Sequence, residues 1–243
     1  MKVSIVTVCF NEEKRIGKTI ESVLGQTYAD IEYILIDGKS SDSTVSIIRS
    51  YSDKDKRISY ISEKDTGLFN AMNKGIAMAN GDYISFMNAG DSLHDETVVE
   101  RVVGELGDGS ADMLCGHTFV FGRKSRVGRI QGKTTLDLEN MIRILNMDWV
   151  CHQAIFYKTK TIKKYYYDEN YPLAADYDLF LRYLKNHRSI IWSRIAICDY
   201  HLDGISNDSK YADRILAEDE LSIRKNYGFF VFWFCRRIWP KFH

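Results

Sequence analysis

The sequence has no net charge, because its 33 Lys and Arg residues balance its 33 Asp and Glu residues. A neutral chain has no overall field that attracts nucleic acid or an anionic membrane, so any contact with phosphate must be local. The five cysteines are odd in number, scattered and never arranged as Cys-x-x-Cys, which argues against a disulfide framework and a zinc site. We therefore expect a reducing, cytoplasmic compartment and no nucleic-acid partner.

Long hydrophobic runs are also missing. No stretch reaches the ~20 apolar residues that a membrane-spanning helix needs. The apolar start of the chain is too short for the core of a signal peptide and lacks a cleavage site, so we interpret it as a buried strand. Two common site motifs are absent as well, since no Gly-x-Gly-x-x-Gly follows this strand and no Gly-x-Ser-x-Gly occurs.

Strand-like and helix-like segments alternate in the first part of the chain. Short apolar runs predict strands at Val3–Val8, Ile31–Ile36, Ile58–Ile61 and Tyr83–Met87. Helical spacing predicts three helices between them, the first capped by Asn11, the second capped by Asp42, and the third at Leu68–Ala79. Such alternation predicts an α/β fold, a mostly parallel sheet with helices on both faces and a ligand crevice at the carboxyl ends of the strands.

The later part of the chain is less regular. We expect a helix near Glu96–Leu106, strands at Met113–Phe121 and Gln153–Tyr157, and a helix at Asp176–Lys185. The length suits a single domain over residues 1–225, with a nucleotide-binding half at 1–110 and an acceptor half at 111–225. Residues 226–243 form an aromatic and basic tail, which suits a membrane interface but equally suits packing on its own domain or on a second subunit.

Three positions stand out as candidates for chemistry. Asp91 follows the fourth predicted strand in a turn of small residues, where an oxygen ligand for Mg²⁺ or Mn²⁺ and an ordinary turn aspartate are both consistent with the pattern. Asp176 and Asp178 lie at the predicted start of a helix, where one of them could be a cap or a proton acceptor. His152 and His201 are further candidates that are weak when taken alone.

Taken in order, several segments resemble glycosyltransferase family 2, the inverting enzymes with the nucleotide-binding GT-A fold. The resemblance covers nearly the whole chain and rests on Ser4–Glu12, Ser22–Tyr28, Ile36–Thr44, Ser62–Gly75, Ala79–Ile84 and Asn88–Asp91. The last of these, Asn-Ala-Gly-Asp, is similar to the metal motif in transferases of bacterial capsule, colanic-acid and other exopolysaccharide assembly. Two departures are Gly38, where the family commonly has a second aspartate, and Asn88 and Gly90, where carboxylates are usual.

The resemblance implies a role for each matching residue. Residues bordering the nucleobase and ribose would be Thr7, Cys9, Asn11, Glu12 and Asp37, and those lining the nucleotide crevice would be Asp65, Gly67 and Asn73. His152 would lie near the donor phosphates. Asp91 would bind the divalent metal, Mn²⁺ or Mg²⁺, with help from His201, and Asp176 would be the catalytic base.

The implied reaction is a single displacement with inversion, from a nucleotide-diphosphate sugar to an acceptor hydroxyl. The implied acceptor is a glycan or lipid-linked glycan in bacterial surface polysaccharide synthesis, reached at the inner face of the membrane. Two other classes remain open, namely a non-catalytic nucleotide-sugar or glycan-binding module and a nucleotidyltransferase. The latter would favour a glycine- and arginine-rich loop after the first strand, whereas Glu12 and Glu13 place carboxylates there.

Overall fold

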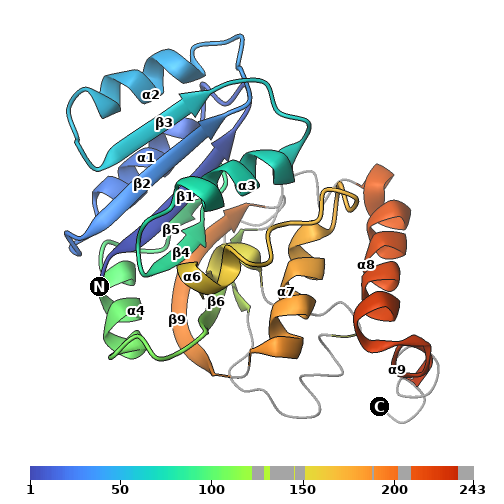
Figure 1. Cartoon of the computed structure of the whole chain (residues 1–243). Coiled ribbons are helices and arrows are strands. Elements are labelled where there is room, and N and C mark those ends of the chain that lie inside the picture. The colour runs from blue at the N-terminus through green and yellow to red at the C-terminus, as the bar shows by residue number, and fades with distance from the viewer. Residues whose placement is uncertain (122–128, 132–144, 146–150, 188, 202–208, 235–243) are drawn as a thin grey trace.

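The computed structural model describes residues 1–121, 129–131, 145, 151–187, 189–201 and 209–234. The strands of this part form one mixed sheet in the order β3-β2-β1-β4-β8-β6-β9-β5, with β7 paired to β6 (Figure 1). The first half of the sheet is parallel and consists of β1 (Val3–Cys9), β2 (Ile31–Asp37), β3 (Ile58–Ser62) and β4 (Tyr83–Phe86). Parallel strands covered on both faces require near-continuous apolar runs, which is why these four were predictable.

The second half of the sheet mixes directions. It consists of β5 (Ser92–Leu93), β6 (Met113–Phe121), β7 (Arg129–Gln131), β8 (Ile155–Lys158) and β9 (Ile190–His201). β8 runs antiparallel between β4 and β6, while β9 is parallel to β6 and antiparallel to β5. β9 was not predicted from the sequence, and it matters because it brings His201 from late in the chain to Asp91, directly before β5.

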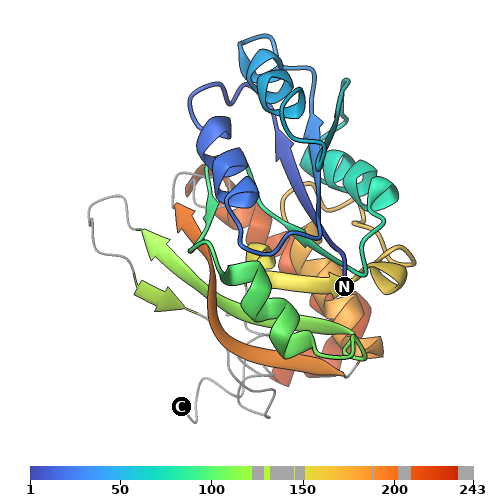
Figure 2. The same ribbon diagram turned by 90° about the vertical axis from the view of Figure 1, so that its left-hand side faces the viewer.

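Helices cover both faces of the sheet, as predicted (Figures 1 and 2). One face carries α1 (Ile16–Leu24), α2 (Thr44–Ser52) and α4 (Val98–Leu106), and the other carries α3 (Leu68–Met78), α6 (Thr159–Ile162) and α7 (Ala175–Asn186). Outside α7 lies α8 (Ala212–Tyr227), which leads into the short α9 (Phe229–Trp233). Two 3-10 turns, η1 (His152–Ala154) and η3 (Ser209–Tyr211), precede β8 and α8.

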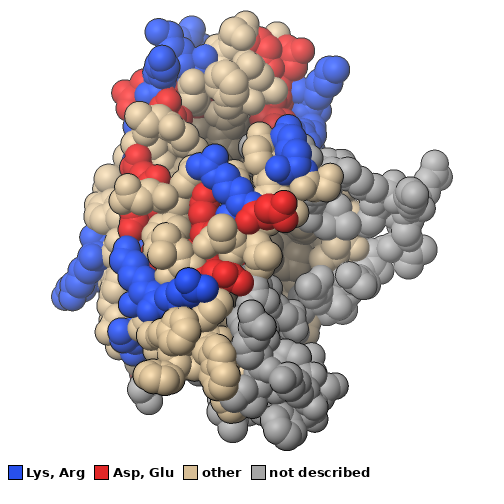
Figure 3. All heavy atoms as spheres, turned by 90° about the vertical axis from the view of Figure 1, so that its right-hand side faces the viewer, with Lys and Arg blue, Asp and Glu red and all other residues tan. Residues whose placement is uncertain are grey.

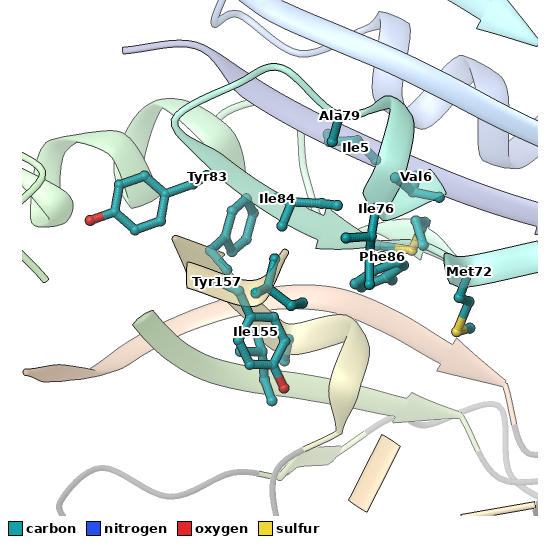
Figure 4. Packing of buried hydrophobic residues seen from close by; sticks show 14 of the residues in the cluster. Ile5, Val6, Met72, Ile76, Ala79, Tyr83, Ile84, Phe86, Ile155 and Tyr157 are labelled. Atoms are coloured by element: carbon teal, nitrogen blue, oxygen red, sulfur yellow. The ribbon is translucent and has the colours of Figure 1, made fainter. Parts of the chain in front are cut away.

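The core between β1, β4 and α3 fixes where the strands end. Val6, Ile76 and Phe86 pack together there, with Tyr157 from β8 on the neighbouring strand (Figure 4). Gly75 allows this close approach, because a Cβ at this position would lie 2.4 Å from Cγ1 of Val6. The loops after β1 and β4 are therefore held side by side by apolar packing beneath them.

The prediction that Asn11 caps the first helix is wrong. Residues 12–15 form a turn instead, so α1 begins at Ile16, and the backbone amides of Arg15 and Ile16 both bond the carbonyl of Glu12. Asn11 has a positive φ of 54°, which asparagine tolerates in turns. Asp42, by contrast, does contact the start of α2, since its Oδ1 accepts a hydrogen bond from the Thr44 amide at 3.0 Å.

Candidate active site

The loops after β1 and β2 form one hydrogen-bonded unit at the carboxyl edge of the sheet. The backbone amide of Ser41 donates to Oδ1 of Asn11 at 2.9 Å, and the amide of Glu12 donates to Oγ1 of Thr44 at 2.8 Å. The Glu12 carboxylate accepts two hydrogen bonds from Arg15, at 2.7 and 2.6 Å. Asn11 and Glu12 therefore shape the loops through their own contacts.

Asp37 ends β2 and is fully buried. Its Oδ2 accepts hydrogen bonds from the Ser40 amide at 3.0 Å and the Ser62 hydroxyl at 2.6 Å, and its Oδ1 accepts from the Ser40 hydroxyl. The Cys9 thiol lies 3.8 Å from the same carboxylate, and burial together with that charge raises the pKa of Cys9. Asp37 thus orders the end of β2, and Cys9 stays a neutral thiol beneath it.

Thr7 lies deeper than the resemblance suggested, because its hydroxyl is buried in the core and pairs with the Tyr33 hydroxyl at 3.0 Å. An aromatic ring occupies the outer position instead. Phe10 is 60% exposed at the end of β1, directly beside Gly38. A Cβ at Gly38 would lie 3.4 Å from the Phe10 ring and 3.1 Å from Oδ2 of Asp65. A side chain at position 38 would therefore crowd Phe10 and the Asp65 carboxylate.

Asp65 and Gly67 lie in the segment before α3, and Asn73 lies within α3. Lys74 bonds the Asp65 carboxylate and also pairs with Glu63 at 2.8 Å, which keeps Asp65 beside Gly38. Gly67 directly precedes the first residue of α3. Asn73 faces the protein, since its amide donates to the Tyr167 carbonyl at 3.0 Å and accepts from the Tyr167 amide at 2.8 Å. Its role in the structure is to position Tyr167.

Asp91 is buried where the loop after β4 meets the end of β9. Its Oδ1 accepts a hydrogen bond from the backbone amide of His201 at 2.9 Å, and its Oδ2 accepts one from Nε2 of Gln153 at 2.6 Å. Burial raises the pKa of Asp91, while these hydrogen bonds and the nearby charges of His201 and Arg15 act to lower it. A carboxylate that accepts one hydrogen bond at each oxygen retains free lone pairs for a cation.

The residues around Asp91 suit a hard divalent cation only in part. Magnesium and manganese prefer oxygen ligands, and Oδ1 of Asn88, three residues earlier, is a buried oxygen without a hydrogen-bond partner among the described residues. The same part of the chain contains no group of three His, Cys, Asp or Glu side chains able to hold a metal. A metal at Asp91 would therefore need phosphate and water oxygens to complete its coordination.

The His201 ring is partly exposed and has two described neighbours. It stacks on Phe121 with ring centroids 5.0 Å apart, and its Nε2 lies 3.5 Å from Nζ of Lys18. Its bonded contact with Asp91 is made by the backbone amide. The structure thus brings the two metal candidates together, but through the main chain of His201.

His152 lies in η1, next to Gln153 in the sequence. Its Nε2 is 3.2 Å from Nδ2 of Asn88. Burial lowers the pKa of His152 to about 4, so the ring is neutral at pH 7. His152 and Gln153, which are consecutive in η1, therefore contact Asn88 and Asp91, the two ends of the loop after β4.

Asp176 lies in the first turn of α7 and has no basic partner among its neighbours in the described structure. Burial and the nearby charge of Glu218 raise its pKa to about 6, although backbone amides of the same turn oppose the shift. The phenol groups of Tyr157 and Tyr167 lie close enough to sense its charge. A carboxylate with a pKa near neutrality is suited to accept a proton.

Asp178 has the opposite environment. It is fully buried and accepts hydrogen bonds from Arg182 at 2.6 Å, Ser222 at 2.9 Å and Asn226 at 3.2 Å. It therefore joins α7 to α8 and is not available for chemistry. The sequence left open whether one of the two aspartates caps α7, and the structure shows that no side chain of its own segment does so.

Two functional neighbours of Asp176 could not be found from the local sequence. Glu218 reaches across from α8 and accepts hydrogen bonds from the backbone amides of Leu173 and Ala174, at 2.9 and 3.0 Å, just before α7 begins. Tyr167 packs on Phe69, and its buried hydroxyl has no partner among the described residues. Neither residue belongs to a recognisable motif, because their contacts come from distant segments.

The comparisons with known proteins agree with this architecture. The family model described as "Glycosyl transferase family 2" matches residues 4–170, so the chain belongs to glycosyltransferase family 2 and is a glycosyltransferase. A "PGL/p-HBAD biosynthesis glycosyltransferase" of Mycobacterium tuberculosis is 29% identical over 98% of this chain and 91% of its own length. The relatives matched therefore do not single out capsule or colanic-acid transferases.

Two solved structures share the fold. The mannosyltransferase PcManGT from Pyrobaculum calidifontis, in complex with GDP-Man and Mn²⁺, has a TM-score of 0.73 at 13% identity, covering 99% of this chain and 71% of that one. S. aureus TarS 1-349, in complex with UDP-GlcNAc, has a TM-score of 0.72 at 19% identity, covering 93% and 68%. Both confirm the predicted GT-A-like α/β fold. Within the described residues, none of the helices is long and apolar enough to cross a bilayer.

Proposed function

We propose that this glycosyltransferase moves a sugar from a nucleotide-diphosphate sugar to an acceptor hydroxyl, with inversion at the anomeric carbon. The observation that carries this proposal is Asp176, a carboxylate whose pKa is raised to about 6 and which no basic side chain of the described structure neutralises. Tyr167 connects the surroundings of Asp176 with the strand that leads to Asp91, because its ring packs on Phe86 of β4 and it lies near Asp176. The base and the phosphate-binding loop thus share one packed region.

In the proposed reaction, Asp176 accepts the proton of the acceptor hydroxyl while that oxygen attacks the sugar carbon from the side opposite the diphosphate. The bond from the carbon to the diphosphate oxygen breaks as the new bond forms, which inverts the configuration. Asp91 would hold a divalent metal, with Gln153 and the His201 amide fixing its carboxylate and the His201 ring as a further candidate ligand. When bound, Mn²⁺ or Mg²⁺ would neutralise the charge that develops on the leaving diphosphate.

We propose different roles for the residues that the resemblance assigned to the nucleotide. Phe10 would stack on the nucleobase, since its ring is exposed beside Gly38 and Asp65 at the end of β1. Cys9, Asn11, Glu12 and Asp37 would shape the loops around it through the contacts described above. Thr7 and Asn73 would act indirectly, because their polar atoms bond Tyr33 and the Tyr167 backbone. Gly67 and His152 remain candidates for the crevice wall.

The acceptor proposal is a glycan or lipid-linked glycan in surface polysaccharide or glycolipid synthesis, with the enzyme working peripherally at the cytoplasmic face of the membrane. Two observations support it, namely the naming of the mycobacterial relatives for PGL/p-HBAD biosynthesis and the exposed aromatic side chains of α9. We further propose that residues 1–110 bind the nucleotide and residues 111–225 supply Asp176 and the acceptor side, with the tail at 226–243 outside this domain.

The direct test is hydrolysis of a panel of nucleotide sugars by the purified chain with Mn²⁺, comparing wild type with Asp91→Ala and Asp176→Ala. We expect one donor to be consumed and both variants to lose turnover. Asp91→Ala should also lose the stimulation by Mn²⁺, whereas Asp176→Ala should retain metal-dependent donor binding. Undiminished binding without turnover of any donor or acceptor would favour a binding module instead.

A further inference from the structure

The backbone between α6 and α7 makes an unfavourable turn at Tyr166. Its φ is 49°, in the left-handed region that glycine and asparagine tolerate but that is uncommon for a bulky aromatic residue. Such a conformation persists only where the surrounding contacts determine it, and it occurs mostly at functional sites. The contacts that hold this turn therefore indicate what it is for.

Arg182 holds the turn from the middle of α7. Its Nη1 donates a hydrogen bond to the Tyr165 carbonyl at 2.9 Å, and its Nη2 donates one to the Tyr166 carbonyl at 2.8 Å. Its Nε donates to the buried carboxylate of Asp178 at 2.6 Å, which fixes the guanidinium in place. All three hydrogen bonds come from one planar group, and the single ammonium of a lysine cannot reproduce this geometry.

The residue that follows the turn is Tyr167. Asn73 bonds its backbone amide and carbonyl, at 2.8 and 3.0 Å, and its ring packs on Phe69 and Phe86 with centroids 5.2 and 5.4 Å away. Burial and the charge of Asp176 raise the pKa of the Tyr167 phenol, so the two side chains lie close together. The turn thus places a buried aromatic ring beside the proposed base.

A buried ring beside a carboxylate excludes water from it. Burial is the main cause that raises the pKa of Asp176 to about 6, and the charge of Glu218 on α8 adds to it. The other titratable groups that sense Asp176 are the phenols of Tyr157 on β8 and of Tyr167. Moving the Tyr167 ring away would admit water, which stabilises the ionised carboxylate and lowers its pKa.

We propose that Arg182 is a positioning residue for the transfer reaction, acting through the turn at Tyr166. By holding this turn, it keeps the Tyr167 ring against Asp176 and keeps water away from the proposed base. This inference rests on the proposed function, because it requires that Asp176 accepts a proton. Asp178 contributes to the reaction indirectly, since its carboxylate fixes the Arg182 guanidinium.

The first test compares Arg182→Lys with the matched control Arg57→Lys. Arg57 also pairs with a nearby aspartate, Asp55 at 2.7 Å, and donates to a backbone carbonyl, that of Leu24 at the end of α1, at 2.9 Å. Both variants should lower the melting temperature. Only Arg182→Lys should lower kcat/KM above pH 7, by roughly tenfold or more, and move the acid limb to lower pH.

Calorimetric titration keeps this comparison independent of folding. The probe is the nucleotide sugar that wild type consumes in the panel, with Mn²⁺ and the full chain. Both variants should bind it with the stoichiometry of wild type, so that unfolded protein does not account for the lost rate.

The second test changes how well position 166 tolerates the left-handed conformation. Tyr166→Asn and Tyr166→Val remove the same ring, but asparagine adopts a positive φ readily, whereas β-branched valine does not. Tyr166→Val should therefore lose rate and shift the acid limb as Arg182→Lys does, and Tyr166→Asn should lose far less. In a Tyr166→Asn background the effect of Arg182→Lys should shrink, because the turn then depends less on the guanidinium.

Each contrary outcome counts against a specific claim. Wild-type rates and pH profiles in both Arg182→Lys and Tyr166→Val would overturn the positioning role and leave the proposed function intact. Equal losses in Tyr166→Asn and Tyr166→Val, or an equal shift of the acid limb in Arg57→Lys, would overturn it as well. Failure of wild type to consume any nucleotide sugar would overturn the proposed function and the positioning role with it.

Discussion

At the scale of single residues, Asp176 and Asp178 show how environment assigns chemistry to identical side chains. They are two positions apart in one helical turn, yet Asp178 accepts hydrogen bonds from three side chains, whereas Asp176 has its pKa raised by burial and by Glu218. A sequence pattern cannot separate them, because the partners of Asp178 include Ser222 and Asn226 of α8. The resemblance to the family selected Asp176, and the structure supplies the physical reason.

We predict that Asp176→Asn abolishes transfer and stabilises the fold. A carboxyl with a raised pKa in the folded state is harder to ionise there than in the unfolded chain, so its charge costs stability above its unfolded pKa. At pH 7 removing the charge should raise the free energy of unfolding by about 1–3 kcal/mol, and this gain should shrink toward pH 5. Thermal melts of wild type and variant at both pH values measure it, and an equal gain at both would contradict the assignment.

The same pKa predicts the acid limb of the reaction. Asp176 must be ionised to accept a proton, so kcat/KM should fall about tenfold per pH unit below pH 6, where the carboxyl becomes protonated. Initial rates between pH 5 and 8 at saturating Mn²⁺ measure this limb. A profile that is flat across pH 6 would exclude Asp176 as the base.

Gln153 is predicted to act through Asp91. Its Nε2 is 2.6 Å from Oδ2 of Asp91 and its side chain is fully buried, so Gln153→Leu removes the donor while keeping most of the volume. Loss of such an orienting partner typically weakens metal affinity about 10–100-fold. We expect activity to need correspondingly more Mn²⁺ and to recover at saturation.

The control for Gln153 is Gln26, which is also buried but bonds the carbonyls of Ser22 and Asp95 and the Val99 amide between α1 and α4. Gln26→Leu should lower thermal stability without changing the Mn²⁺ requirement. Equal metal dependence in both variants would show that Gln153 has only a structural role.

At the scale of helices and strands, an element could be predicted from the sequence when its buried side is apolar. The first four strands and α3 were predictable to within one or two residues because they are apolar on their buried sides. α8 was not predicted, since its buried positions include Glu218, Asp219 and Ser222. β9 was missed because its side chains do not alternate strictly between the two faces of the sheet. Its pairing with β6 shifts register between Trp192 and Ala196, which pair with Cys115 and His117.

The candidate site was predictable to a similar extent. The loops that end parallel strands identified Asp37 and Asp91, because polar residues after buried strands meet at one edge of the sheet. The supporting contacts were not predictable, since the hydrogen bonds of Gln153, Glu218 and Tyr167 join residues that are 44 or more positions apart in the sequence. Sequence motifs identify the residues that would react, whereas the residues that hydrogen-bond or pack on them are known only from the structure.

The contact between α8 and α7 makes a prediction at this scale. Glu218 caps the start of α7 and its charge raises the pKa of Asp176. Glu218→Gln keeps a carbonyl oxygen for the amides of Leu173 and Ala174 but removes the charge. The acid limb of kcat/KM should therefore move to lower pH while the fold is retained.

Asp213→Asn is the matched control, because it removes a carboxylate from the exposed first turn of the same helix. Its pH profile should coincide with that of wild type. A limb that shifts equally in both variants would point to the net charge of the protein rather than to the α8–α7 contact.

At the scale of the whole molecule, the net charge is zero but the charged residues are unevenly distributed along the sequence. After Glu220 the sequence contains five Lys and Arg residues and no Asp or Glu. The face that carries α8 shows mixed charges, with uncharged surface toward its lower end (Figure 3). In α9 the side chains of Phe229, Phe230 and Trp233 are 60%, 84% and 46% exposed, while Phe232 is buried under the Arg224 guanidinium. Arg224 and Lys225 pair with Glu220 and Asp168, so the feature of this region that suits a membrane interface is the group of exposed aromatic rings in α9.

We predict that the pair of substitutions Phe230→Ser and Trp233→Ser releases the protein from vesicles containing anionic lipid without changing hydrolysis of the donor. Both side chains are exposed, so their loss removes apolar contact with lipid at little cost to the fold, and the active-site loops are untouched. Co-sedimentation with anionic and with neutral vesicles measures the effect, with Leu216→Ser and Leu221→Ser on α8 as the matched exposed control. If the aromatic face instead pairs two copies of the chain, the variants would change the molecular mass in solution and leave sedimentation with lipid unaltered, because a dimer contact depends on protein concentration and not on lipid charge.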